Sequence, residues 1–99
     1  MVRYAVSSDQ VAENERLVRA VYEELDRINP PGIRYTTFKL DDGVTFVHIA
    51  SLETDDRGNP LDDIVAFREF QRDLRARVTD GPAASELSEI GSYRLVAIP

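Results

Sequence analysis

The sequence has no cysteine, no tryptophan and a single histidine among its 99 residues. Without cysteine the chain forms no disulfide, zinc ribbon or iron–sulfur cluster, and one histidine cannot make a multi-histidine metal site. We therefore expect neither a metal ion nor a cofactor. Runs of apolar residues are also short, far below the ~20 residues that span a bilayer, so no membrane partner is expected.

Basic side chains are the minority charge, since 12 Lys and Arg against 18 Asp and Glu leave a net charge of −6. A nucleic-acid-binding surface needs a basic footprint, so nucleic acid is not an expected partner. The segment Met1-Val2-Arg3-Tyr4 has neither the apolar stretch nor the cleavage site of a signal peptide, which predicts a cytoplasmic protein. With 42% hydrophobic residues, the composition is that of one globular domain over residues 1–99.

Hydrophobic periodicity predicts four strands and two helices. The predicted strands are rich in β-branched and aromatic residues and cover residues 2–7, 33–40, 44–53 and 93–98. Apolar stripes at helical spacing predict helices over residues 10–28 and 60–78, the second capped by Asn59 and stopped at 79–82, where Gly81 suits a left-handed cap. Residues 83–90 fit either a short helical turn or the opening of a strand. This βαββαβ order predicts an α+β, ferredoxin-like fold with both helices on one face of an antiparallel sheet.

The Asp42-Gly43 turn decides which residues of the central hairpin face each other. Both residues tolerate a positive φ, so they favour a two-residue type I′ turn that pairs Asp41 with Val44. Thr37 then lies opposite His48, on the sheet face that we assign to the helices. A three-residue turn would instead place Thr36 opposite His48.

Large apolar side chains also occupy the other face of this hairpin, namely those of Phe38, Val47 and Ile49. A sheet with one face in water should alternate cleanly between apolar and polar residues, and this one does not. Monomers seldom expose an apolar patch of that kind. We therefore expect these three residues to form the interface of a homodimer.

Several short motifs accompany this element order. Pro31-Gly32 precedes the second predicted strand, an Asp-Gly hairpin leads into Thr45-Phe46-Val47-His48, the second helix contains Ala66-Phe67-Arg68-Glu69-Phe70, and Gly91-Ser92-Tyr93-Arg94 stands near the end. In these features the chain resembles the dimeric α+β barrel superfamily, and within it uncharacterised actinobacterial members of the antibiotic-biosynthesis-monooxygenase-like group.

The resemblance implies a homodimer whose two sheets face each other, with a small-molecule cavity between each sheet and its helices. One functional alternative is a cofactor-independent monooxygenase acting on an aromatic or polyketide-like substrate. Catalytic members of that branch rely on a tryptophan, which this chain lacks, so the resemblance assigns no catalytic residue. The other alternative is a non-catalytic ligand-binding or regulatory dimer module.

Four residues are predicted to line this cavity: Tyr35, Thr37, His48 and Phe67. His48 is the only candidate for catalysis, because an imidazole titrates near neutral pH. The alternative is a core histidine that is hydrogen-bonded to Thr37. The remaining tyrosines are expected at the edges of the core with their hydroxyl groups in water. These are Tyr4, Tyr22 and Tyr93.

Overall fold

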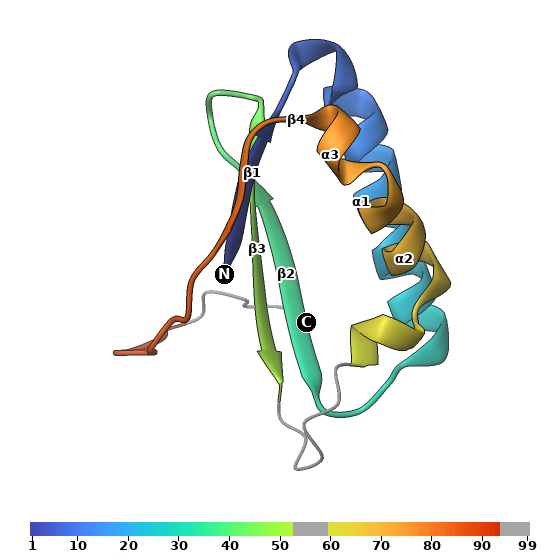
Figure 1. The fold of residues 1–99 in the computed structure, drawn as a ribbon. Helices are drawn as coiled ribbons and strands as arrows, with labels where there is room; N and C mark the ends of the chain where they lie inside the picture. The colour runs from blue at the N-terminus through green and yellow to red at the C-terminus, as the bar shows by residue number, and fades with distance from the viewer. Residues whose placement is uncertain (53–59, 94–99) are drawn as a thin grey trace.

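A computed structural model describes residues 1–52 and 60–93 of the chain (Figure 1). Its strands form one four-stranded sheet in the order β2-β3-β1-β4, and every neighbouring pair is antiparallel. The strands are β1 (Val2–Val6), β2 (Ile33–Lys39), β3 (Thr45–Leu52) and β4 (Val78–Ala84).

The helices lie together on one face of this sheet, as Figure 1 shows. The architecture is therefore α+β and compatible with the predicted ferredoxin-like arrangement. Its helical segments are η1 (Ser8–Gln10), α1 (Val11–Ile28), η2 (Pro60–Asp63), α2 (Val65–Arg72) and α3 (Leu74–Arg77).

The predicted register of the β2–β3 hairpin is confirmed, because Thr37 lies opposite His48. The predicted turn type is wrong. A type I′ turn needs positive φ at both central residues, and here Gly43 has a φ of 80° while Asp42 is not in the left-handed region. The Asp42 carboxylate instead accepts hydrogen bonds from the backbone N–H groups of Val44 and Thr45, both at 2.9 Å, which holds a longer loop in the same register.

The second predicted helix is shorter and more divided than its apolar stripe suggested. Ile64 is extended, with a ψ of 113°, and separates η2 from α2. The predicted cap, Asn59, lies outside the described residues. The cap that the structure shows at α2 comes from α1, where the Glu24 carboxylate accepts the backbone N–H groups of Val65 (3.0 Å) and Ala66 (2.9 Å). An acidic side chain at a helix N-terminus is favourable, so Glu24 fixes α2 against α1.

The fourth strand begins where the sequence pattern predicted the end of the second helix. Val78 is the first residue of β4 rather than the last of a helix, because the β-branched pair Val78-Thr79 extends and pairs with β1. Gly81, expected as a helix cap, lies inside β4 with a φ of 86°, at a register shift beside β1. A Cβ there would stand 2.7 Å from the carbonyl oxygen of Arg3, so only glycine fits.

The two alternatives for residues 83–90 both differ from the structure, in which β4 ends at Ala84 and residues 85–93 form neither helix nor strand. The predicted last strand over 93–98 falls, apart from Tyr93, outside the described residues.

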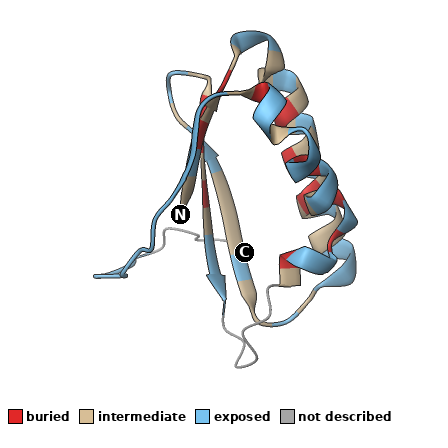
Figure 2. Cartoon of the chain, viewed as in Figure 1, coloured by how far each residue is buried: buried red, intermediate tan, exposed pale blue. Residues whose placement is uncertain are grey.

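The core lies between the sheet and the helices (Figure 2). It combines side chains from β1, β3, α1 and α2 with the short η2 turn. Its buried hydrophobic members are Tyr4, Val6, Val18, Val21, Phe46, Leu61, Ile64, Ala66 and Phe70.

The opposite face of the sheet carries the predicted interface residues. Phe38 is 42% exposed, and its register partner Val47 is half-buried, as is Ile49. Because side chains alternate along a strand, these three residues share the face opposite to that of Thr37 and the buried His48, and this face is turned away from the helices.

Candidate functional site

A buried polar network lies in the middle of this otherwise apolar core, centred on His48 of β3. The His48 side chain is only 6% exposed. Its Nε2 lies 2.8 Å from the Tyr4 hydroxyl of β1, and its Nδ1 lies 2.6 Å from the Tyr35 hydroxyl and 3.2 Å from Thr37 Oγ1 of β2. The two strands that flank β3 thus surround the imidazole, with one hydroxyl group from β1 and two from β2.

The network continues from Tyr4 into the helices. Asn14 of α1, which is fully buried, donates from Nδ2 to the Tyr4 hydroxyl oxygen at 2.9 Å. Arg77, the last residue of α3, donates from Nε to Asn14 Oδ1 at 3.1 Å and from Nη2 to the Phe70 carbonyl oxygen at 2.8 Å. Within the described residues no fully enclosed side-chain nitrogen or oxygen lacks a partner.

Arg77 determines the direction of every hydrogen bond that follows. A guanidinium only donates, so Asn14 Oδ1 is the acceptor and the Asn14 amide nitrogen is turned toward Tyr4. The Tyr4 oxygen accepts that bond, and its own proton is donated to His48 Nε2. A neutral imidazole carries one N–H, which therefore resides on Nδ1 and donates toward Tyr35 and Thr37.

Burial keeps the groups of this network in their neutral forms. It lowers the pKa of His48 to about 4, so the imidazole is uncharged at neutral pH. Burial raises the pKa of Tyr4 and that of Tyr22 to about 12, and raises the pKa of Tyr35 further still. None of these phenols is ionised under physiological conditions.

The network reaches the surface at Thr37. Thr37 Oγ1 lies 2.7 Å from the hydroxyl of Tyr22 of α1. Both residues line a groove of about 370 Å³ between α1 and the sheet, which we call the Thr37 groove. Its other lining residues are Glu15, Val18, Arg19, Lys39 and Phe46.

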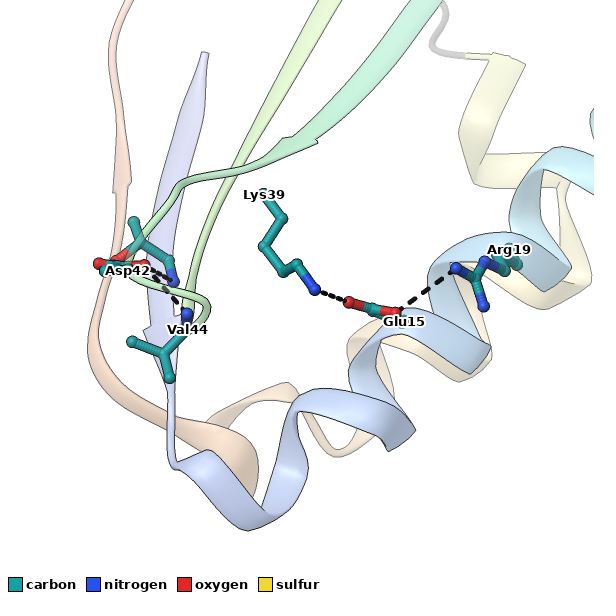
Figure 3. Close-up of polar contacts among 6 residues, drawn as sticks. Glu15, Arg19, Lys39, Asp42 and Val44 are labelled. Carbon is teal, nitrogen blue, oxygen red and sulfur yellow. Dashed lines mark hydrogen bonds and ion pairs between the residues drawn. The ribbon is translucent and has the colours of Figure 1, made fainter.

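Charged side chains at this groove form ion pairs with one another (Figure 3). The Glu15 carboxylate forms ion pairs with Lys39 from β2 and with Arg19 from the next turn of α1, the latter at 3.5 Å. The hydrogen bond from Lys39 holds the pKa of Glu15 below its ordinary value. The groove thus combines a paired ionic cluster with neutral hydroxyl groups.

Aromatic rings surround the imidazole. Tyr4 and Phe70 have ring centroids 5.3 Å from that of His48. Phe67 meets Tyr35 edge-on at 6.4 Å. These distances are those of favourable aromatic pairs.

The structure brings three of the four predicted site residues together, and of the four only Thr37 is among the lining residues of the Thr37 groove. Tyr35, Thr37 and His48 are joined by hydrogen bonds, and Phe67 contacts Tyr35. Thr37 lines the Thr37 groove, and His48 is hydrogen-bonded to it from the buried side.

Two tyrosines lie in other surroundings than predicted, and two polar residues of the network were not predicted. The hydroxyl groups of Tyr4 and Tyr22 were expected in water, but both are bonded inside the network, while Tyr93 is exposed as expected. Asn14 and Arg77 received no role. A signal was present in both cases, since Asn14 occupies an apolar position of the α1 stripe and Arg77 follows Phe70 and Leu74 at helical spacing. A polar residue in an apolar stripe indicates a buried hydrogen-bonded group.

No family model, curated protein or solved structure matches this chain. No cluster of three or more His, Cys, Asp or Glu side chains able to hold a metal ion occurs in residues 1–52 and 60–93. Among the helices of the same ranges, none combines the length and apolar character needed to cross a bilayer.

The neutral His48 makes stability depend on pH. Because the folded pKa of about 4 is below the ordinary 6.5, the unfolded chain binds more protons between these values. The contribution of neutral His48 to the free energy of unfolding is about 3 kcal/mol. It is fully present above pH 6.5 and is lost as the pH falls toward 4. The free energy of unfolding can be measured with denaturant at pH 7.5 and at pH 5. Between these pH values, wild type should lose about 2 kcal/mol more of it than His48→Gln does. Equal losses would contradict a buried neutral imidazole, as would an imidazole NMR signal that titrates near pH 6.5.

Proposed function

We propose that this protein is a homodimer that binds a small molecule in the Thr37 groove of each subunit. The observation that carries the proposal is the fixed direction of the buried network. It brings an N–H of His48 to Tyr35 and Thr37, and the Thr37 hydroxyl is in turn hydrogen-bonded to Tyr22 at the groove, where both hydroxyl groups are available to a ligand. Small-molecule sites commonly combine an apolar wall with a few polar groups placed in this way.

The lining of the groove indicates the class of ligand. Val18 and Phe46 supply apolar surface, and Thr37 and Tyr22 supply neutral hydroxyl groups. Among the described lining residues, the one carboxylate, that of Glu15, is shared by the two cations Arg19 and Lys39, which leaves a single positive charge that favours hydrogen-bond acceptors on the ligand. A largely aromatic molecule bearing hydroxyl or carbonyl groups, such as a phenol or a polyketide-like ring system, fits this lining best.

Binding is favoured over acid–base catalysis because His48 presents a donor toward the groove. Its acceptor nitrogen is occupied by Tyr4, and burial lowers its basicity. A cofactor-independent monooxygenase-like activity on an aromatic substrate is the second candidate. It is supported by the aromatic cluster behind Thr37, in which Phe67 and Phe70 have centroids 6.1 Å apart, and by the resemblance described above.

The homodimer is supported by the apolar patch on the sheet face turned away from the helices. Phe38, Val47 and Ile49 form this patch. Covering it with the same patch of a second copy gives a symmetric contact and removes apolar area from water at about 25 cal/mol per Å² before association costs. A dimeric ferredoxin-like barrel follows if the two sheets face each other.

Thr37→Val should weaken ligand binding because it removes a groove hydroxyl while keeping the shape of the side chain. With 2-naphthol as the probe, we expect at least a tenfold loss of affinity by calorimetry, or about 1.4 kcal/mol. The matched control is Thr36→Val, the same change one residue away on the opposite sheet face, which should bind like wild type. Equal affinities of the three proteins, or no saturable binding to wild type, would refute the site. Oxygen uptake with a panel of hydroquinones then distinguishes an enzyme from a binding protein.

Ile49→Asp should abolish the homodimer, because a carboxylate desolvated at the interface has no partner there. Light scattering at micromolar concentration should give a dimer mass for wild type and a monomer or aggregate for the variant. Ile28→Asp makes the same chemical change at an exposed position of α1 and should stay dimeric. A monomer mass for wild type would end the dimer proposal and leave the ligand-binding proposal to its own test.

A further inference from the structure

A second groove lies at the other end of the buried network, between the first half of α1 and the α2–α3 segment. It has a volume of about 450 Å³ and shares no lining residue with the Thr37 groove. The residues that line it are Gln10, Glu13, Arg16, Leu17, Glu69, Arg72, Asp73, Ala76 and Arg77. We call it the Arg77 groove.

The guanidinium of Arg77 is buried, with the residue 4% exposed, yet only part of its hydrogen-bonding capacity is used. Of the five N–H donors of an arginine, one on Nε binds Asn14 and one on Nη2 binds the Phe70 carbonyl oxygen. Nη1 has no hydrogen-bond partner among the described residues, and it is not fully enclosed, because no fully enclosed nitrogen there lacks a partner. Arg77 lines the groove, which is where a ligand could reach this atom.

No carboxylate in residues 1–52 and 60–93 forms an ion pair with this guanidinium. Besides its two hydrogen bonds, the guanidinium has the face of Phe70, whose centroid lies 5.4 Å from Cζ, and the carboxylates of Asp73 and Glu13 beyond ion-pair distance. Burying a charge without a directly paired counter-charge is costly, and such a group gains most from a desolvated anion. Burial lowers the pKa of Arg77 from its ordinary value, which reflects this cost.

The other groups of the groove restrict the charge and shape of an anion. Glu13 is paired with Arg16. Of the other charged residues at the lining, Arg72 and Arg77 are balanced by Glu69 and Asp73, so the groove has no net positive charge to hold a second negative charge. Leu17 and Ala76 provide apolar surface beside Arg77. The groove therefore suits a single negative charge attached to a short apolar tail.

We propose that the Arg77 groove binds a small organic monocarboxylate, with the carboxylate on Nη1 of Arg77 and its tail against Leu17 and Ala76. A planar carboxylate matches the fork of a guanidinium, and the charge-assisted hydrogen bonds are among the stronger ones in proteins. This site is separate from the Thr37 groove and does not depend on the function proposed for it.

The test is a titration of the full-length protein with butyrate at constant ionic strength, followed by NMR shifts and calorimetry. Butyramide, the uncharged analogue, and inorganic phosphate serve as comparison ligands. We expect saturable binding of butyrate with shifts at α1 and α3, no saturation with butyramide, and phosphate binding at least tenfold weaker. Absence of saturation with butyrate, or equal binding of butyramide or phosphate, would overturn the proposal.

Ala76→Glu provides a variant that does not remove a buried group. Ala76 is exposed and lines the groove, so the new carboxylate would occupy the place of the ligand. Butyrate affinity should fall at least tenfold. Gln71→Glu adds the same charge to the exposed surface of α2 outside the lining and should leave the affinity within twofold of wild type. Equal affinities of these two variants would contradict the assignment.

Discussion

The hydrogen bond from Arg77 Nε to Asn14 Oδ1, at 3.1 Å, is the interaction on which the interior of this protein depends. It joins the end of α3 to α1 and fixes the orientation of an amide that is fully buried. Since an arginine can only donate, the amide must donate onward to Tyr4 and Tyr4 onward to His48. One obligatory donor thus orders a network that spans α1, α3 and three strands.

This order explains how so many polar groups are accommodated in a thin core. A buried network is stable when every member is satisfied, and a half-satisfied one costs more than an apolar core. Here each enclosed group in the described residues has its partner. Hydrogen-bonding capacity remains at the two ends of the network, at Thr37 beside the Thr37 groove and at Arg77 beside the Arg77 groove. Both proposed sites lie at these ends because only there can a ligand add a hydrogen bond without breaking one.

The local parts of this structure could be predicted from sequence, and the long-range parts could not. The Asp42-Gly43 signal gave the correct hairpin register, and with it the meeting of Thr37 and His48, although the turn itself is of another type. Register survives such an error because it depends on which residues pair, and the apolar alternation of both strands favours the same pairing.

The misplaced elements depended on contacts between segments distant in sequence. The start of β4 at Val78 is set by pairing with β1, which outweighs the helical spacing of that residue. Likewise, the hydroxyl group of a tyrosine on an amphipathic strand is normally in contact with water. In Tyr4 it is hydrogen-bonded instead to Asn14 of α1 and His48 of β3. The apolar stripe of α1 did contain the clue, because Asn14 interrupts it where a hydrophobic residue is expected.

The most direct test of the ordered network is the protonation of the two ring nitrogens of His48, measured by ¹⁵N NMR at pH 7. The chain has one histidine, so the imidazole signals need no further assignment. The account predicts a neutral ring with the proton on Nδ1 and an unprotonated Nε2 that accepts from Tyr4. A ring protonated on Nε2, or on both nitrogens, would contradict it, because the direction imposed by Arg77 would then not reach the imidazole.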